Sequence, residues 1–362
     1  MTRYVNSSSN AKKVLIVCPG YTAGAIAADY DNARGVAELL KTSGYSVSLL
    51  DFEKKAKNMN LCTLYFTSIL GNRLKLWRSL LSFDDGLVYG FFLPVVFAIS
   101  MARKALGLRF KLVGFMAGAP LSSSWLVRGL YLFMAILTVR TCDGMVFHRE
   151  SFATRFSNFS KKSIQLGGIL IDESMTLYSE LEKQNRKKEM GLKDKVLVGV
   201  IGPFNGVNLP ALRYVLENLD KFSEKIVFVF IGDISEEQRI NNPRLIFTGR
   251  VDNLMYTLSM LDCALIPRFF KTGSPMSKMV YAMAAGLSVV TNDPEGMRVR
   301  NGVEAMVGSL AELPNLLNSL ADNCYLRREI GKNARNYIIK YYNKRLEGER
   351  LVRFFESVQV SR

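Results

Sequence analysis

The stretch DCALIPRFFKTGSPMSKMVYAMAAGLSVVTN, residues 262–292, has the pattern of a strand, a loop, a helix, a tight turn and a second strand. The apolar run 263–267 ends in a proline and suits a strand that is buried on both faces of a parallel sheet. Ser274 is a preferred N-cap and Pro275 suits the first helical position, so we expect a helix directly after them. Gly286 ends that helix before another apolar run, which predicts the next strand.

The predicted helix has two different faces. One face is apolar and should point to the core; it consists of Met276, Met279, Val280 and Met283. The other face holds Ser274, Lys278 and Tyr281. The loop 271–274 offers free backbone N–H groups to a ligand, and Lys271 and Lys278 add two cations near the helix N-terminus. This combination suits an anion, although ordinary N-cap chemistry would use the same loop without a ligand.

Length and composition predict a globular protein with two domains. The chain has 362 residues and a hydrophobic fraction of 49%, which is enough for two cores. Its five cysteines lie far apart and mostly in apolar runs. We expect buried, reduced thiols of a cytoplasmic protein, and neither a disulfide framework nor a zinc site. His148 is the only histidine, which argues against a Ser-His-Asp triad and against a metal site of several histidines.

The net charge of +16 is spread over both halves of the chain. It suits anionic partners, which could be nucleotide phosphates, acidic lipid headgroups or nucleic acid. No nucleic-acid-binding motif is visible, so no nucleic-acid partner is expected. Residues 1–13 are polar and lack the apolar core of a signal peptide, which predicts a cytoplasmic location.

The first half begins with its own βαβ pattern. It consists of a strand at 12–18, a glycine-flanked loop at 20–24, a helix at 27–43 and a strand at 45–51. This order is that of a doubly wound sheet. The loop lacks the pattern Gly-x-Gly-x-x-Gly, so a nicotinamide or flavin enzyme gets little support. Further strands are expected at 86–90, 109–115 and 144–147.

Three apolar segments raise the question of a membrane. Residues 61–81 combine an apolar body and Trp77 with basic residues, as a membrane-surface segment does, but an ordinary packed helix would explain them equally well. Residues 86–102 are uncharged, but Pro94 divides them into a strand and a helix that are each too short to span a bilayer. Residues 129–139 are shorter still. A peripheral position on the inner face of an anionic membrane stays open.

A charged segment at 180–195 separates the two series of strands and helices. Because it is poor in apolar periodicity, it predicts either a linker or an exposed helix that opens the second domain. A new strand begins at Lys195, and residues 333–355 predict a basic amphipathic helix.

Nearly all of the second half resembles the C-terminal domain of the GT-B glycosyltransferases, in particular of family 4, the group 1 enzymes. The resemblance rests on KVLVGVIGP (195–203), IVFVFIGD (226–233), NPRLIFTGR (242–250), residues 256–262, KMVYAMAAG (278–286) and residues 333–342. It implies two Rossmann-like, doubly wound parallel-sheet domains that face an interdomain cleft. The implied parts are an acceptor-side domain (1–180), a charged linker (181–194), a nucleotide-sugar domain (195–340) and a C-terminal helix (341–362) that packs back toward the first domain.

The resemblance implies a hexosyltransferase-type enzyme that moves a sugar from a UDP- or GDP-linked donor to a glycan or lipid-linked acceptor. It also implies retention of configuration and no bound metal. The nucleotide-sugar is then a substrate, so no separate cofactor is implied. The implied donor-binding residues are Gly202, Arg250, Lys271, Thr272, Gly273, Ser274, Lys278 and Tyr281. Lys278 and Lys271 are the catalytic candidates, and the acceptor-side residues are Gly20, Gly24, Met116 and Ala117.

Three features of the family are missing from the sequence. Gly273 and Tyr281 stand where the family has paired glutamates, the turn 116–120 lacks the usual histidine, and the loop after Gly202 lacks the usual arginine and lysine. Tyr281 still offers a hydroxyl group, and Gly273 lets backbone N–H groups approach a ligand. The alternative that these losses leave open is a catalytically inactive GT-B protein that acts as a binding or scaffolding subunit at the membrane surface.

Overall fold

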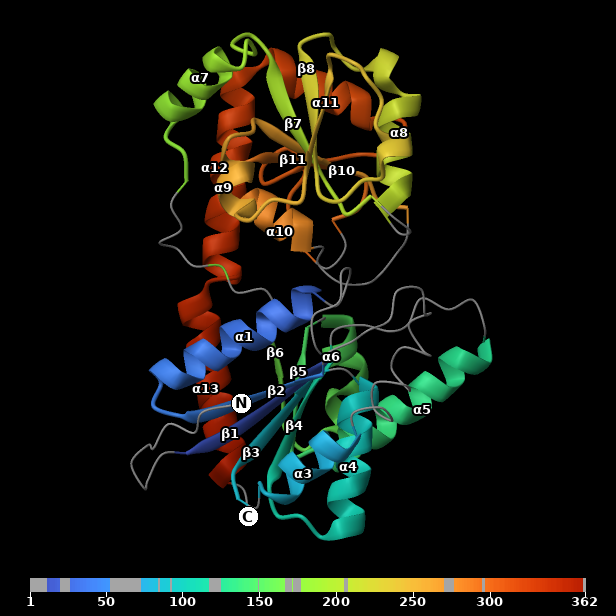
Figure 1. Ribbon diagram of the computed structural model, residues 1–362, viewed down its shortest axis with the longest axis vertical. Coiled ribbons are helices and arrows are strands. Elements are labelled where there is room, and N and C mark those ends of the chain that lie inside the picture. Colours follow the sequence, from blue (N-terminus) through green and yellow to red (C-terminus); the bar gives the residue numbers. More distant parts are fainter. Residues whose placement is uncertain are drawn as a thin grey trace. The chain divides into compact units, whose positions relative to one another are not determined.

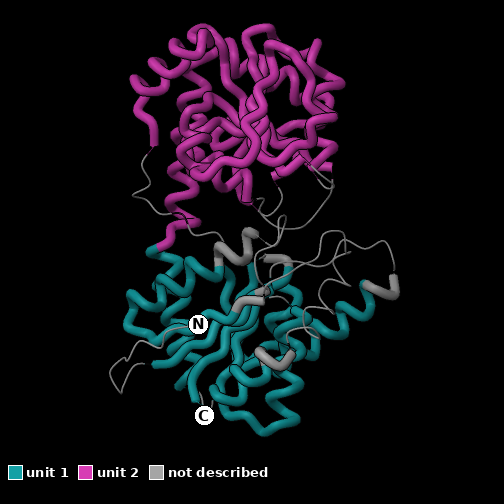
Figure 2. The backbone as a smooth tube through the Cα atoms, viewed as in Figure 1, with its two compact units in different colours: residues 1–170, 345–362 teal, residues 171–344 magenta. Residues whose placement is uncertain are grey.

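The structure is a computed structural model. It describes residues 12–19, 27–52, 73–83, 85–91, 93–116, 125–148, 150–166, 171, 177–204, 208–269, 277–294 and 297–360. The chain forms two compact units (Figure 2): unit 1 comprises residues 1–170 and 345–362, and unit 2 comprises residues 171–344. Each unit has a six-stranded parallel sheet with flanking helices, which confirms the predicted doubly wound α/β class.

Unit 1 alternates strands and helices along the chain (Figure 1). Its strands are β1 (Lys13–Pro19), β2 (Ser46–Phe52), β3 (Leu87–Phe91), β4 (Lys111–Met116), β5 (Gly144–Phe147) and β6 (Ser163–Gln165). Its helices are α1 (Ala27–Thr42), α3 (Arg73–Leu81), α4 (Leu93–Leu106), α5 (Trp125–Thr141), α6 (Glu150–Phe156), η1 (Ser157–Phe159) and α13 (Lys344–Val360). The strands pair in parallel in the order β2-β1-β3-β4-β5-β6.

Helices cover both faces of the sheet in unit 1. Buried side chains of α4 and α5 pack on one face, and those of α1 and α13 pack on the other (Figure 1). The inner strands β3 and β5 are therefore buried along their whole length, because helices cover both faces of the sheet there, whereas the edge strand β6 is partly exposed. On the second face, the rings of Tyr89 and Phe355 meet edge to face with their centroids 5.1 Å apart. The C-terminal helix α13 thus completes the core of unit 1.

Unit 2 repeats this arrangement with a different strand order. Its strands are β7 (Val196–Ile201), β8 (Ile226–Ile231), β9 (Leu245–Gly249), β10 (Cys263–Ile266), β11 (Ser288–Thr291) and β12 (Met306–Val307). Its helices are α7 (Glu180–Glu189), α8 (Leu209–Glu217), η3 (Leu219–Lys221), η4 (Glu236–Gln238), α9 (Leu254–Ser259), α10 (Ser277–Ala284), α11 (Leu313–Asp322) and α12 (Cys324–Tyr341). The order is β12-β11-β10-β7-β8-β9, so the direction of winding reverses between β7 and β10.

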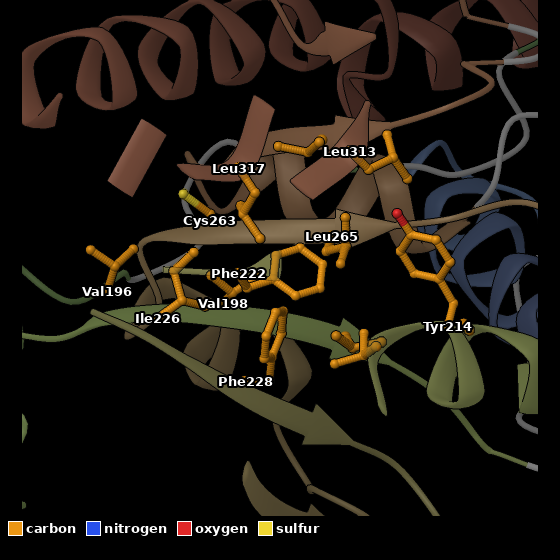
Figure 3. Close-up of a cluster of buried hydrophobic side chains, with 14 of the residues drawn as sticks. Val196, Val198, Tyr214, Phe222, Ile226, Phe228, Cys263, Leu265, Leu313 and Leu317 are labelled. Atoms are coloured by element: carbon orange, nitrogen blue, oxygen red, sulfur yellow. The ribbon is translucent and has the colours of Figure 1, made fainter. Parts of the chain in front are cut away.

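One core of unit 2 lies between the sheet and the helices α8 and α11 (Figure 3). Its side chains come from β7, β8 and β10, and include Val198, Phe228 and Leu265, which are fully or almost fully buried. The rings of Phe222 and Phe228 pack edge to face with centroids 4.9 Å apart. This packing holds β7 and β10 rigidly side by side, which matters because the candidate site lies at their ends.

The decisive stretch 262–292 forms the predicted strand, helix and strand as β10, α10 and β11. Met279, Val280 and Met283 are buried, as their spacing predicts. Gly286 has a positive φ of 78°, its N–H donates to the Met283 carbonyl, and the Leu287 N–H donates to the Ala282 carbonyl. Gly286 therefore ends the helix in the left-handed conformation that glycine adopts most easily.

Of the two alternatives for residues 180–195, a linker or an exposed helix that opens the second domain, the structure has the helix: α7 belongs to unit 2, and the linker expected at 181–194 is wrong. Ser179 caps α7 in a capping box with Glu182. The helix has little apolar periodicity because it is anchored by charge: Lys183 and Lys187 both reach Asp262, which precedes β10. The division between the units falls after residue 170, whereas the sequence suggested residue 180.

The expected single helix at 333–355 is wrong, because the chain breaks between α12 and α13. The Ile171 N–H donates to the Tyr342 carbonyl and the Lys344 N–H donates to the Ile171 carbonyl. Asn343 thereby forms a parallel β-bridge with Ile171. Pairing with a segment far away in the sequence interrupts a pattern that looks continuous locally. As a result, α12 belongs to unit 2 and nearly all of α13 to unit 1.

The described cysteines are free thiols, and three of them are buried: Cys18, Cys142 and Cys263. Cys324 differs from the expectation because it is exposed, at the start of α12. Cys62 lies outside the described residues. In the part of the chain that the structure describes, no helix combines the length and the apolar character that a membrane span needs.

Candidate functional site

The reversal of strand order in unit 2 marks one place in the fold for a ligand. Where neighbouring parallel strands send their loops to opposite faces of a sheet, a crevice opens at their carboxyl ends. In unit 2 these strands are β7 and β10. The chain leaves β7 through Gly202 toward α8, and it leaves β10 through Pro267 toward α10. The residues that follow β7 and β10, which we call the exits of these strands, therefore define the candidate site.

The exit from β7 is a tight backbone turn. The Gly202 N–H donates to the Ile231 carbonyl at 2.7 Å, and the Phe204 N–H donates to the Asp233 carbonyl at 2.8 Å. A Cβ at Gly202 would lie 2.7 Å from the Phe204 ring. A Cβ at Gly232, which has φ of 129°, would lie 3.2 Å from the Gly202 backbone. Glycine at both positions lets the two strand ends approach, which places the start of α8 close to the sheet.

The exit from β10 is fixed by the side chain of Asn292, which follows β11. Its Oδ1 accepts the Arg268 N–H at 2.6 Å, and its Nδ2 donates to the Arg268 carbonyl at 2.9 Å. The Thr291 hydroxyl donates to the Ile266 carbonyl at 2.8 Å. The Arg268 side chain is itself buried. The backbone beyond β10 is therefore held in one position before the chain turns toward α10.

A lysine joins the two exits. The Lys278 Nζ, in the first turn of α10, donates to the Asn208 Oδ1 at 2.6 Å, and Asn208 is the N-cap residue of α8. Asn208 makes no capping hydrogen bond to its own helix, since its oxygen is used by Lys278. Burial lowers the pKa of Lys278 from 10.5 to about 8. Among the described residues, no carboxylate forms an ion pair with this ammonium group.

This geometry suits an anion. A partly buried ammonium whose described partner is a neutral amide keeps an uncompensated positive charge, which disfavours the charged form and lowers the pKa. The N-terminus of α8 adds the positive end of a helix dipole and backbone N–H groups that lack intrahelical partners. A phosphate at this place would accept hydrogen bonds from both sources and restore the pKa of the lysine.

The structure positions the other predicted donor-binding residues less completely. Tyr281 is half-buried, one turn beyond Lys278 on α10, and Arg250 is exposed directly after β9, at the edge of the sheet. Gly202 shapes the turn described above. Lys271, Thr272, Gly273 and Ser274 lie outside the described residues, so their predicted roles stay predictions.

The predicted acceptor-side residues Gly20, Gly24 and Ala117 also lie outside the described residues. Met116 ends β4, and its side chain is buried in the core of unit 1. The Met116 carbonyl accepts the His148 N–H at 3.0 Å. The side chain of Met116 therefore packs inside the domain, so that any contact of this residue with an acceptor would have to come from its backbone.

Sequence reasoning missed Asn208, Arg268 and Asn292. Asn208 precedes Leu209 and Pro210, a pattern typical of a helix start, so this signal was available. The pairing of Asn292 with Arg268 had no sequence signal, because both are ordinary loop residues, and they follow different strands. Lys278 was identified, but its contact with a residue 70 positions away was not.

Solved structures of similar fold define the fold class of the chain. The structure of Anabaena HepE in complex with UDP-glucose matches with a TM-score of 0.71 and 15% identity, over 96% of this chain and 100% of that chain. Sucrose-phosphate synthase from Thermosynechococcus elongatus matches with a TM-score of 0.74 and 11% identity, over 96% of this chain and 99% of that chain. The chain thus has the GT-B fold.

The sequence of unit 2 resembles one family of glycosyltransferases. Residues 195–324 match the family model described as glycosyl transferases group 1. An uncharacterized glycosyltransferase of Methanocaldococcus jannaschii is 24% identical over 241 residues, which are 60% of this chain and 61% of that relative. The match thus spans about three fifths of the relative's length. The matched segment, which contains Lys278 and Asn208, is thus similar to the group 1 glycosyltransferases.

Proposed function

We propose that the protein transfers a sugar from a nucleotide-sugar to a glycan or lipid-linked acceptor, and that unit 2 binds the diphosphate of the donor between the ends of β7 and β10. The observation that supports this most directly is the Lys278–Asn208 hydrogen bond of 2.6 Å. It places a partly buried cation at the N-terminus of α8, where a nucleotide-binding sheet of this order receives phosphate.

The identity of the donor rests on the relatives. HepE structures hold UDP and UDP-glucose, so a UDP-hexose is the first candidate for this chain and a GDP-sugar the second. The reaction is then of the hexosyltransferase type. The Tyr281 hydroxyl, one turn beyond Lys278 on α10, is the group that we assign to the ribose of the nucleotide.

The chemical task of the site is to stabilise the departing diphosphate. Negative charge builds up on that group as the bond to the sugar breaks, and a positioned ammonium with helix-end N–H groups can supply several kcal/mol there, typically about 3 kcal/mol for one strong donor. Lys278 and the start of α8 would provide this stabilisation without a metal ion. Backbone N–H groups of the loop 271–274 would add to it, and transfer would proceed with retention of configuration.

The experiment is a thermal-shift and calorimetry screen of the full chain with UDP, GDP and their sugar derivatives. A ligand at 100 times its Kd should raise the free energy of unfolding by about 2.7 kcal/mol. We expect a shift with at least one nucleotide diphosphate, and its loss in Lys278→Met. The control Lys225→Met removes an exposed lysine that pairs with Asp322, and it should bind like the parent. Absence of any nucleotide binding would reject the proposal.

A catalytically inactive binding subunit is the second candidate, because Tyr281 and not glutamate stands at the position that meets the ribose in the family. The two candidates differ in turnover. An active enzyme releases free UDP or GDP from the bound donor when an acceptor is supplied, whereas a binding subunit holds the donor unchanged. Chromatography of the nucleotide after incubation with membrane lipid extracts distinguishes them.

A further inference from the structure

Helix α5 in unit 1 exposes an apolar stripe. Leu130 and Phe133 are exposed by 55% and 59%, although both are large hydrophobic residues. Leu137 and Arg140 continue the same stripe at helical spacing. The opposite stripe of the helix contains buried residues, namely Ala135, Thr138 and Val139. The helix is therefore anchored in the core by one side and presents leucine and phenylalanine on the other.

The stripe continues onto the neighbouring 3-10 helix η1. Phe159 of η1 is exposed by 38%, and the Arg140 guanidinium lies over its ring, 5.2 Å from the centroid. Arg128 is also exposed, but its helical position is that of Ala135 and Val139, on the opposite side of α5. We call the surface formed by Leu130, Phe133, Arg140 and Phe159 the α5 patch. It combines three exposed apolar side chains with a cation at one end.

The helices around the α5 patch have one sign of charge. Helices α3, α4 and α5 contain seven lysine and arginine residues and no aspartate or glutamate. These three helices pack on the same face of the sheet in unit 1 (Figure 1). Arg103 among them is paired with Asp143, and the others leave these helices with an excess of positive charge. An apolar surface in a positive field attracts a partner that is apolar and negative at once, and an anionic bilayer surface has this combination.

We propose that the α5 patch binds the surface of an anionic lipid bilayer. Leu130, Phe133 and Phe159 would enter the boundary between headgroups and acyl chains, and Arg140 would extend to the phosphates. Since α5 stays anchored in the core of unit 1, it lies on the membrane and does not cross it. Binding to lipid needs no donor and goes beyond the proposed function, but it would bring a lipid-linked acceptor to unit 1.

The test uses the full chain and vesicles of phosphatidylcholine, with or without roughly one third phosphatidylglycerol. We expect cosedimentation with the anionic vesicles, little with the neutral ones, and weaker binding as salt increases. The variant Arg140→Gln should bind about fivefold more weakly, which is the expected contribution of one cation. The double variant Leu130→Gln/Phe133→Gln should lose at least about tenfold, because its apolar area no longer enters the membrane.

A matched control comes from unit 2. Leu181 of α7 is exposed by 71%, and Leu181→Gln removes an exposed apolar side chain without touching the α5 patch. This variant should bind vesicles like the parent. Urea unfolding of each variant shows whether it is folded, and glutamine is a good helix former at exposed positions.

Three results would overturn the proposal: equal binding to neutral and anionic vesicles, unchanged binding of both α5 variants, or a parent chain that binds no vesicles. If the parent instead forms a dimer that Leu130→Gln/Phe133→Gln dissociates, the α5 patch is an interface between two copies and the membrane proposal fails. UDP binding of the same variants separates this inference from the proposed function, because we expect it to be unchanged.

Discussion

The two ends of the strand pair β7 and β10 differ in how a buried charge is surrounded: at one end opposite charges neutralise it, and at the other end they do not. At the amino end, Asp262 contacts Lys187 at 3.0 Å and Lys183 at 3.2 Å, and it accepts the Leu197 N–H at 2.8 Å. At the carboxyl end, Lys278 contacts the neutral amide of Asn208. The first end is a completed ionic anchor that ties α7 to the sheet. The second end has a positive charge that an anionic ligand can neutralise.

The pKa shifts follow from this difference. Burial alone would raise the pKa of Asp262, but the two lysines and the Leu197 N–H outweigh burial and hold this pKa below its ordinary value. Burial lowers the pKa of Lys278 to about 8, and no charge on the residues that the structure describes offsets this effect. A structural ion pair in a folded protein is expected to stabilise its charged state, whereas a binding group kept ready for a ligand is expected to be destabilised until the ligand arrives.

The largest expected effect concerns the amino end. Asp262→Asn leaves the charges of Lys183 and Lys187 without a buried counter-ion, and both lysine side chains are largely buried. We expect the free energy of unfolding to fall by about 3 kcal/mol in urea denaturation. The control Asp322→Asn removes an exposed partner of Lys225 and should cost less than about 1 kcal/mol. Equal losses in the two variants would show that the anchor is not structural.

At the carboxyl end, removal of the charge should not destabilise the protein. Lys278→Met removes a desolvated ammonium, so the free energy of unfolding at neutral pH should stay the same or rise by about 1 kcal/mol. Binding of UDP should weaken roughly 100-fold, because a charged hydrogen bond to phosphate contributes about 2–3 kcal/mol. Calorimetric titration measures the affinity and urea denaturation the stability. If Lys278→Met were less stable than the parent and bound UDP with normal affinity, Lys278 would be a structural residue and not a binding residue.

The pH dependence sharpens the contrast. The pKa of Lys278 is about 8 in the folded protein against an ordinary 10.5, so the unfolded chain binds more protons between these values. Relative to Lys278→Met, the parent should therefore gain stability as the pH rises from about 8 to about 10. Its affinity for UDP should fall over the same interval, by up to about tenfold per pH unit above the pKa. Parallel pH profiles of parent and variant would contradict this.

The smallest expected effect concerns Asn292, and it distinguishes a role in positioning the site from a role in stability alone. Asn292→Ala removes the two hydrogen bonds to the Arg268 backbone, and we expect it to cost about 1 kcal/mol in unfolding and several-fold in UDP affinity. Asn318 makes a similar pair of bonds, accepting from the Ser223 N–H and donating to the Lys221 carbonyl. Asn318→Ala should therefore cost similar stability and leave the affinity unchanged. An equal loss of UDP affinity in both variants would show that Asn292 does not position the site.

The sequence predicted those parts of the fold that depend on local patterns. The buried strands, the apolar face of α10 and the turn at Gly286 follow from spacing, proline and glycine alone. The pairing of Ile171 with Asn343 and the ionic anchoring of α7 depend on contacts between distant residues, so local periodicity gave the wrong result there. The same limit applies to the site: Lys278 could be predicted as a cation near a helix N-terminus, but its partner Asn208 could not.

The central claim is that Lys278 carries a charge kept for the diphosphate of a nucleotide. The most direct test is an NMR titration of 13C-labelled lysine side chains, in which Lys278→Met assigns the signal. We expect the pKa of Lys278 to be about 8 in the free protein and to rise by at least about one unit when UDP is bound. The same pKa with and without bound UDP would contradict the claim.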